Sequence, residues 1–397
     1  MNISFSFIIP VYNRPEEIRE LLDSLALQTY GAAFEIVVVE DGSTIPCEAV
    51  IEDFKRMYLQ GSSPISLTYL KKSNSGPGRS RNYGMVRAKG DYFIILDSDC
   101  ILPPHYLDAV TKSLQEHFVH CYGGPDAAHA SFSLVQKGID YAMTSVLTTG
   151  GIRGKRKAFQ KNHKGRPSGQ GRKASASAQV ETGRSSSSGD NGNQSNNFGT
   201  RQDSPAKQKG FQPRSFNMGL SRIAFEATGG FGNIHPGEDP DLVFRLWGKG
   251  FATKLIPTAF VYHKRRIDWQ KFFLQVKKFG SVRPILNRRY PRTAKMTYWF
   301  PTLFCLGFMA ASMLWYLGIR LPMLLYVLYL GFVFLDSLLK NRSLAVALLS
   351  LVAVCIQFMG YGYGFIKSTI FLNFSGKPAE RLFPELFFGS TDTEDRT

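Results

Sequence analysis

The sequence predicts an α/β protein in which a mostly parallel sheet is covered by helices on both faces and is followed by transmembrane helices. Three observations predict this fold class. Apolar strand patterns alternate with helical patterns over the first hundred residues, acidic residues follow two of these strands, and the last third contains three long apolar segments. Strands that are apolar throughout are typical of parallel sheets that are buried on both faces.

The alternating elements are defined by their apolar spacing. Strand patterns occupy residues 5–10, 34–39, 66–70 and 92–96, and helical patterns begin at Pro15 and near Gly78. Asn13 is expected to cap the first helix, because its side chain can accept a hydrogen bond from the first helical turn. Parallel strands present their carboxyl ends at one rim of the sheet, where such proteins bind their ligands.

Three apolar segments follow at residues 297–317, 321–339 and 343–366. The first and third contain no charged residue, and the second contains only Asp336. Each is close to the ~20 residues that cross a bilayer as a helix. We therefore expect three transmembrane helices within residues 296–367, followed by a tail at residues 368–397.

The charged flanks of these segments predict their orientation. Basic residues cluster before the first segment, Lys340 and Arg342 lie between the second and third, and only Arg320 separates the first two. Loops rich in Lys and Arg remain in the cytoplasm. The N-terminal domain is therefore expected to be cytoplasmic, and the tail is expected on the opposite side of the membrane.

The segment 266–295 is basic and amphipathic. Its aromatic and aliphatic residues Trp269, Phe272, Phe273, Val276 and Phe279 recur at helical spacing. A helix of this kind either lies on an anionic membrane surface or packs with its apolar face on the rest of the chain. The pattern favours the membrane surface, and the packed helix is the alternative.

The net charge of +17 is confined to two parts of the chain. Residues 151–213 contain 13 Lys or Arg against 3 Asp or Glu, and residues 264–295 contain 11 against Asp268 alone. Since the remainder is not basic, we expect no nucleic-acid partner. Residues 151–213 are low in complexity and almost free of aliphatic side chains, so they predict a disordered basic insertion, either solvated or used in recognition.

Acidic pairs follow two of the predicted strands. Glu40 and Asp41 follow the second, and Asp97 and Asp99 follow the fourth within the sequence DYFIILDSD. Asp97 and Asp99 project to the same side, so they repel each other unless a cation or hydrogen-bond donors compensate them. Hard divalent ions prefer oxygen ligands. Either pair alone is compatible with a solvated turn, but two pairs at neighbouring strand ends favour a metal-diphosphate site.

Three further features lie between and beyond these pairs. A Gly-rich stretch at residues 74–84 contains Arg81, which suits an anion at a helix start but also a flexible loop. Glu238 and Asp239 open a predicted helix, where acids either favour the helix dipole or provide a general base. His263 ends a short apolar run and is either a metal ligand or a half-buried strand-end histidine.

Six segments in this order resemble the family 2 glycosyltransferases, which have the GT-A fold. They are residues 8–13, 37–43, 76–82, 95–99, 217–222, and the stretch from Gly229 to Asp239. The resemblance covers about residues 5–265 and implies a GT-A domain at residues 1–265, interrupted by the insertion. It is closest to the membrane-anchored bacterial type, which implies a multi-pass protein of the inner membrane.

The resemblance also implies roles for individual residues. Those placed at the nucleotide-sugar are Pro10, Tyr12, Glu40, Asp41, Arg81 and Asp97. Asp99 and His263 would hold Mg²⁺ or Mn²⁺, and Asp239, assisted by Glu238, would deprotonate the acceptor. Activation of the acceptor hydroxyl opposite the leaving diphosphate implies inversion at the sugar carbon.

The expected function is therefore transfer of a sugar from a nucleotide-diphosphate sugar to a hydroxyl of a lipid-linked or cell-envelope glycan. A processive polysaccharide synthase is an alternative, although its QxxRW-type motif is absent after Asp239. A non-catalytic GT-A-like protein that binds anionic lipid or polyanions is the second alternative. The presence of all four acids Asp97, Asp99, Glu238 and Asp239 favours the enzyme.

Overall fold

A seven-stranded mixed sheet forms the centre of the N-terminal domain. The computed structural model describes residues 3–128, 132–149, 210–263 and 268–388. Its strands, in spatial order, are β3 (Ile65–Lys72), β2 (Phe34–Asp41), β1 (Phe5–Val11), β4 (Tyr92–Leu96), β8 (Asn217–Ser221), β6 (Cys121–Gly123) and β9 (Thr253–Leu255). The first four are parallel, and β8 is antiparallel to both its neighbours. The expected mixed, mostly parallel sheet is confirmed.

Helices cover both faces of this sheet. One face carries α1 (Pro15–Ala26), α2 (Glu48–Tyr58) and α4 (Tyr106–Glu116), and the other carries α3 (Pro77–Arg87), α8 (Arg222–Thr228) and α9 (Glu238–Gly248). Successive residues of β1 explain the two cores, since Phe7 and Ile9 pack on the first face and Ile8 on the second.

The start of α1 differs from the expectation. Asn13 does not cap the helix, because its side-chain oxygen accepts a hydrogen bond from the backbone N–H of Ile45 at 2.9 Å. Its backbone has φ of 54°, a left-handed conformation that asparagine tolerates better than most residues. Asn13 therefore fastens the end of β1 to the loop after β2.

A second, three-stranded sheet lies at the rim of the first. It has the order β5 (Cys100–Ile101), β10 (Val261–His263) and β7 (Asp126–Ala128). Because His263 pairs with Cys100 in antiparallel register, this sheet brings the end of β10 beside the turn that follows β4.

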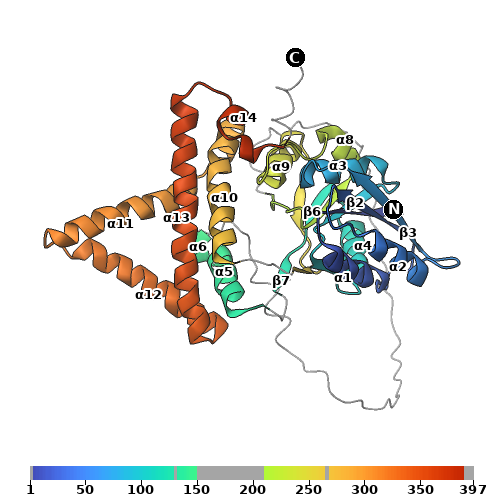
Figure 1. Cartoon of the computed structure of the whole chain (residues 1–397), viewed down its shortest axis with the longest axis horizontal. Helices are drawn as coiled ribbons and strands as arrows, with labels where there is room; N and C mark the ends of the chain where they lie inside the picture. Colours follow the sequence, from blue (N-terminus) through green and yellow to red (C-terminus); the bar gives the residue numbers. More distant parts are fainter. Residues whose placement is uncertain (1–2, 129–131, 150–209, 264–267, 389–397) are drawn as a thin grey trace, which may run out of the picture.

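The C-terminal part begins with α10 (Trp269–Arg289) and two short 3-10 turns, η1 (Pro291–Thr293) and η2 (Met296–Trp299). Three long apolar helices follow, α11 (Phe300–Tyr316), α12 (Leu321–Asn341) and α13 (Leu344–Phe374). Counting η2 with α11, each is long and apolar enough to cross a membrane, as expected. Figure 1 shows α11 and α12 as a V whose apex points away from the sheet domain, while α13 runs beside α10.

Glycines bring α10 and α13 into close contact. A Cβ atom on Gly280 of α10 would lie 2.1 Å from the carbonyl oxygen of Tyr361, and one on Gly364 of α13 would lie 2.3 Å from that of Lys277. The apolar residues Phe272 and Val276 are buried in this contact. Of the two interpretations of this segment, the structure shows the packed helix, because the apolar face of α10 contacts α13.

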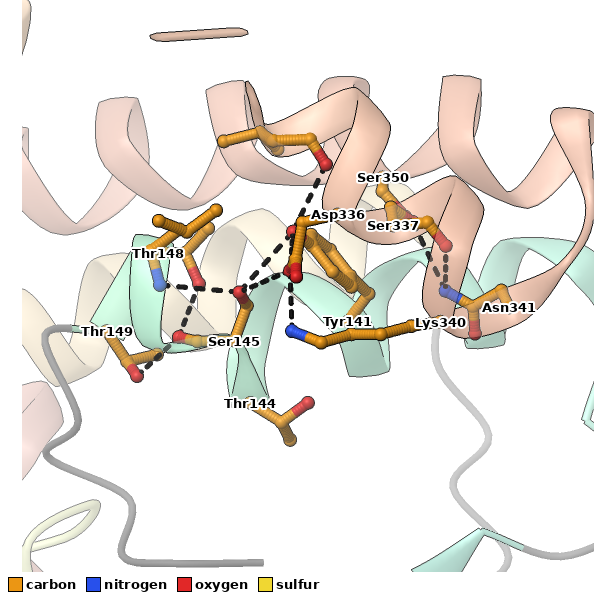
Figure 2. A network of polar contacts seen from close by, with 12 residues as sticks. Tyr141, Thr144, Ser145, Thr148, Thr149, Asp336, Ser337, Lys340, Asn341 and Ser350 are labelled. Carbon is orange, nitrogen blue, oxygen red and sulfur yellow. Dashed lines mark hydrogen bonds and ion pairs between the residues drawn. The ribbon is translucent and has the colours of Figure 1, made fainter. Parts of the chain in front are cut away.

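Two helices of the N-terminal half also lie on the membrane-side helices. They are α5 (Leu134–Thr144), which packs on α13, and α6 (Val146–Thr149), where the Leu147 carbonyl accepts a hydrogen bond from the Tyr329 hydroxyl of α12. Asp336 of α12 accepts hydrogen bonds from the Tyr141 hydroxyl at 2.7 Å and from Ser145 at 3.3 Å, and pairs with Lys340 at 2.5 Å (Figure 2). The single charge within the predicted second span is therefore compensated near the helix end.

The described part of the tail returns to the sheet domain. It contains α14 (Ala379–Leu382) and η3 (Pro384–Leu386). Phe387 forms a β-bridge with Ile234, and the Phe388 N–H donates to the carbonyl of Asn233 at 3.0 Å. Such contacts cannot form across a bilayer. The prediction that the tail lies on the opposite side of the membrane from the N-terminal domain is therefore wrong as far as residue 388.

Two predictions fall outside the described residues. Of the basic insertion at 151–213, the structure describes only residues 210–213, and of the tail at 368–397 it describes only residues 368–388.

Candidate active site

Arg81 of α3 joins two of the predicted acidic segments. Its Nη2 lies 2.8 Å from Oδ1 of Asp97, which follows β4, and its Nη1 lies 3.4 Å from Oε1 of Glu238, the first residue of α9. Arg81 is buried, and its guanidinium lies over the ring of Phe231. The two ion pairs connect the end of β4 to the start of α9. Removal of either partner would leave a buried charge uncompensated, so separating these two ends is costly.

Glu238 and Asp239 are neighbours with opposite electrostatic environments. Burial alone would raise the pKa of Glu238, but the hydrogen bond with His235, 3.0 Å away, and the charge of Arg81 lower it to about 2. Burial, reinforced by the charge of Glu238, raises the pKa of Asp239 to about 6. Neighbouring acids whose pKa values are pushed apart are typical of acid–base sites.

Asp239 does not act as a helix cap. The N-cap position of α9 is Gly237, and no side chain caps this helix end. Oδ1 of Asp239 is buried and has no hydrogen-bond partner. A buried acceptor without a partner is costly, so it indicates a donor that is supplied by a ligand.

Asp99 and His263 form the pair that could hold a divalent ion. Oδ1 of Asp99 lies 2.9 Å from Nε2 of His263, and both side chains are largely buried. Adjacent ligands of an octahedral ion lie about 3 Å apart, so the spacing fits Mg²⁺ or Mn²⁺. The Cys100 thiol lies within reach of both groups, but burial raises its pKa well above the usual value, and a protonated thiol is a poor ligand.

The other residues assigned to the nucleotide lie at the ends of β1 and β2. Glu40 accepts hydrogen bonds from Ser43, the Cys47 N–H and the Tyr69 hydroxyl, so its carboxylate positions the loop after β2. Asp41 accepts hydrogen bonds from the N–H groups of Ser75 and Gly76 at 2.9 Å and thereby fixes the start of the Gly-rich stretch. At the β1 end, Pro10 is half-buried and Tyr12 is 49% exposed.

A cavity of about 2480 Å³ brings part of the predicted site together. Arg81, Asp97, Glu238, Asp239 and His263 all line it. The opposite wall is formed by residues of α10, the η1–η2 segment, the start of α11 and the middle of α13. The predicted residues of β1 and β2 do not line this cavity, so the site has two parts along the sheet rim.

Three residues of the site were not identified from the sequence. Arg14 lies 2.8 Å from Asp99, His235 contacts Glu238, and Lys72 lies 2.5 Å from Asp41. Arg14 could have been identified from the sequence, since it follows β1 at the rim where ligands bind. His235 and Lys72 had none, because only the folded loops place them beside these acids.

Two family models match the chain. The one described as glycosyl transferase family 2 matches residues 6–175, and the one described as glycosyl transferase family group 2 matches residues 216–358. A solved structure, the mannosyltransferase PcManGT from Pyrobaculum calidifontis in complex with GDP-Man and Mn²⁺, has a TM-score of 0.50 at 16% identity, covering 95% of this chain and 89% of that one. The GT-A fold is thus confirmed.

Curated relatives match over shorter segments. The poly(ribitol-phosphate) beta-N-acetylglucosaminyltransferase TarS of Staphylococcus aureus is 32% identical over 116 residues, which are 29% of this chain and 19% of TarS. The glycosyltransferase GlyA of Streptococcus pneumoniae is 34% identical over 110 residues, 28% of this chain and 15% of GlyA. The chain thus matches less than a fifth of the length of either relative. The two family models together match residues 6–175 and 216–358, and by these matches the chain belongs to glycosyl transferase family 2.

Proposed function

We propose that this protein transfers a sugar from a nucleotide-diphosphate sugar to a hydroxyl group of an acceptor, with inversion at the sugar carbon. The observation that carries the proposal is the unpaired Oδ1 of Asp239, which lines the same cavity as Asp97 and His263. The names of the relatives support the reaction class, since TarS transfers N-acetylglucosamine and PcManGT was solved with GDP-Man.

The donor end of the site is assigned to Asp97, Asp99 and His263. Mg²⁺ or Mn²⁺ held by Asp99 and His263 would neutralise the charge that develops on the leaving diphosphate. Arg81 fixes the orientation of Asp97 through the 2.8 Å ion pair, so the Asp97 carboxylate is available to the sugar or ribose hydroxyls in one position. The exposed Tyr12, with Pro10 and Asp41, forms the neighbouring nucleotide part of the rim.

The acceptor end is assigned to Asp239. With a pKa of about 6, this carboxylate is mostly ionised at neutral pH and is a stronger base than an ordinary aspartate. It accepts the proton of the acceptor hydroxyl while that oxygen bonds to the sugar carbon and the bond from this carbon to the diphosphate oxygen breaks. Attack from the side opposite the diphosphate inverts the carbon.

The packing of α10 supports a particular membrane arrangement. This helix carries basic residues along its whole length, including Lys271, Lys278 and Arg288, and α13 lies beside it. If α13 crossed the bilayer, these charges would enter the hydrocarbon core, which is costly. We infer that α11 and α12 cross the membrane as a hairpin, while α10 and α13 lie at its cytoplasmic surface. This arrangement keeps the tail on the same side as the sheet domain.

The reaction is tested with full-length protein in membranes of an expressing strain. We expect release of a nucleoside diphosphate from one member of a nucleotide-sugar panel, and loss of this release in Asp239→Asn and Asp99→Asn. The matched control is Asp91→Asn, because Asp91 is an exposed acid at the opposite end of β4 that bonds to Ser4. Absence of release with every donor, or equal release by the variants, contradicts the proposal.

A further inference from the structure

The cavity extends from Glu238 and Asp239 to a wall whose charged residues are all basic. The charged residues that line it from α10 onward are Lys271, Lys278, Arg283, Arg292 and Lys295. Among the described residues of this wall, none that lines the cavity is acidic. A partly enclosed basic surface without compensating carboxylates attracts an anionic ligand.

Polar atoms without partners lie at the centre of this wall. Nη1 of Arg283, Oε1 of Gln275 and Oε1 of Gln357 are buried and have no hydrogen-bond partner. The Arg283 guanidinium is held over the ring of Tyr298 at 4.4 Å, which fixes its plane. Arginine with a free N–H suits phosphate oxygens, and the free glutamine oxygens are acceptors that suit the hydroxyl groups of a glycan.

This wall adjoins the proposed base. Val282 of α10 packs against Gly237, the N-cap residue of α9, so closely that a Cβ on Gly237 would lie 2.5 Å from Cγ1 of Val282. Arg283 follows Val282 and therefore belongs to the turn of α10 that contacts α9 at Gly237. Gly237 is two residues before Asp239. Figure 1 shows α10 between α13 and the sheet domain.

Part of the cavity lining is apolar and exposed. Leu274 of α10, and Phe300 and Leu303 of α11, line the cavity, and they are 44–59% exposed. In the proposed membrane arrangement these residues lie where α11 enters the bilayer. An apolar chain can therefore pass from the cavity into the lipid without crossing water.

We propose that the acceptor is a lipid in which a phosphate or diphosphate group joins the hydrocarbon chain to the accepting glycan. The anionic group lies at Arg283, the chain leaves between α10 and α11, and the glycan hydroxyl reaches Asp239. This inference rests on the proposed function and adds the chemical class of the acceptor and its route of entry.

Binding of a short lipid phosphate tests the proposal. The full-length protein is placed in phosphatidylcholine nanodiscs, and equilibrium binding of radiolabelled farnesyl phosphate is measured. We expect saturable binding, with farnesol and inorganic phosphate competing at least about tenfold more weakly, because each lacks one half of the recognised chemistry. Equal competition by farnesol would overturn the assignment of the anionic site.

Variants of α10 locate the binding group. Arg283→Gln is expected to weaken farnesyl phosphate binding about 10- to 100-fold, the range for a lost charged hydrogen bond, and Arg283→Lys to restore part of it. Lys277→Gln is the matched control, since Lys277 is on the same helix but lies over Tyr363 and does not line the cavity. If both glutamine variants lost the same binding affinity, the positive charge of the helix as a whole would explain binding. That result would overturn the proposal.

Two further arms separate the possible sources of a negative result. In the first, phosphatidylglycerol replaces part of the phosphatidylcholine in the nanodiscs. If phosphatidylglycerol displaces farnesyl phosphate at equal concentration, the site binds membrane phospholipid and the proposal of a specific acceptor is wrong. Nucleoside diphosphate binding with Mn²⁺ is measured in every variant. If this binding persists while farnesyl phosphate fails to bind, the acceptor proposal is wrong and the donor function is unaffected.

Discussion

His263 and Asp99 lie 2.9 Å apart although 164 residues separate them in the sequence. The pairing of β10 with β5 creates this contact, because it sets His263 beside Cys100, the residue after Asp99. The same short sheet therefore couples the end of the GT-A domain to the acidic turn after β4. Any change that disrupts this pairing removes one ligand from the proposed metal site.

Asp99→Asn and His263→Ala are expected to lower Mn²⁺-dependent nucleoside diphosphate binding by at least about tenfold, since the first removes the negative charge of one ligand and the second removes the other ligand. Isothermal titration with and without Mn²⁺ measures the effect. Asp91→Asn, at the other end of β4, should bind as the unchanged protein does. Tight binding that resists EDTA in all variants would exclude the assigned metal site.

Asp239→Asn is expected to lower turnover by about 10²- to 10⁴-fold, the usual contribution of a general base, while donor affinity stays nearly constant. Glu238→Gln should cost less turnover, because Glu238 acts through Arg81 and Asp239. Steady-state kinetics and donor binding separate the two effects. A loss confined to donor affinity would place the base elsewhere.

The pH dependence of turnover should report Asp239. Its carboxylate must be ionised to accept a proton, so turnover should rise with pH through about 6 and level off above 7. In Glu238→Gln the neighbouring negative charge is absent, which lowers the pKa of Asp239 and moves the rising limb to lower pH. A pH profile that is identical in both proteins would show that Asp239 does not control it.

The proposed hairpin is tested by labelling single cysteines in a cysteine-free background. A cysteine at Ile319, in the apex between α11 and α12, should react with an impermeant maleimide from outside the cell. Cysteines at Asn193 and Lys377 should react only after permeabilisation. Labelling of a cysteine at Lys377 from outside would support three spans and contradict the hairpin.

Gly280→Ala is expected to separate α10 from α13, since the new methyl group would meet the Tyr361 carbonyl at 2.1 Å. Overpacking of this kind costs about 1–3 kcal/mol, which should lower the melting temperature of the detergent-solubilised protein. Gly331→Ala is the matched control, because that helical glycine of α12 has no atom within 4 Å of the added Cβ. A melting temperature of Gly280→Ala at or above that of the control would contradict the tight packing.

The sequence predicted the sheet and the positions of the acids at its rim, because both depend on local patterns. Apolar strands ending in acids give the positions of Asp97 and Asp99, and a glycine-rich turn precedes Asp239. The position of α13 beside α10 could not be predicted, since its 31 residues are long and apolar enough to cross a membrane and give no sign of a packing partner. The contacts of Gly280 with Tyr361 and of Gly364 with Lys277 show that a basic helix lies beside it.

The hydrogen bonds of Glu40 could not be predicted from the sequence, because they depend on residues of other elements. Its partners Cys47 and Tyr69 lie on a loop and a neighbouring strand, so no local pattern distinguishes a carboxylate that fixes a loop from one that faces a ligand. The family pattern gives the position of such a residue. The folded neighbourhood decides which of its oxygen atoms remain free.

The chain leaves the sheet domain through α10 and returns to it through Phe387 and Phe388. Phe388 also packs against the position of Gly76, where an added Cβ would lie 2.5 Å from its ring. With both attachments in place, the catalytic domain cannot swing on a single tether. In the proposed membrane arrangement, the height of Asp239 above the bilayer would then be fixed. The distance between the lipid surface and the reacting hydroxyl would decide which acceptors reach it.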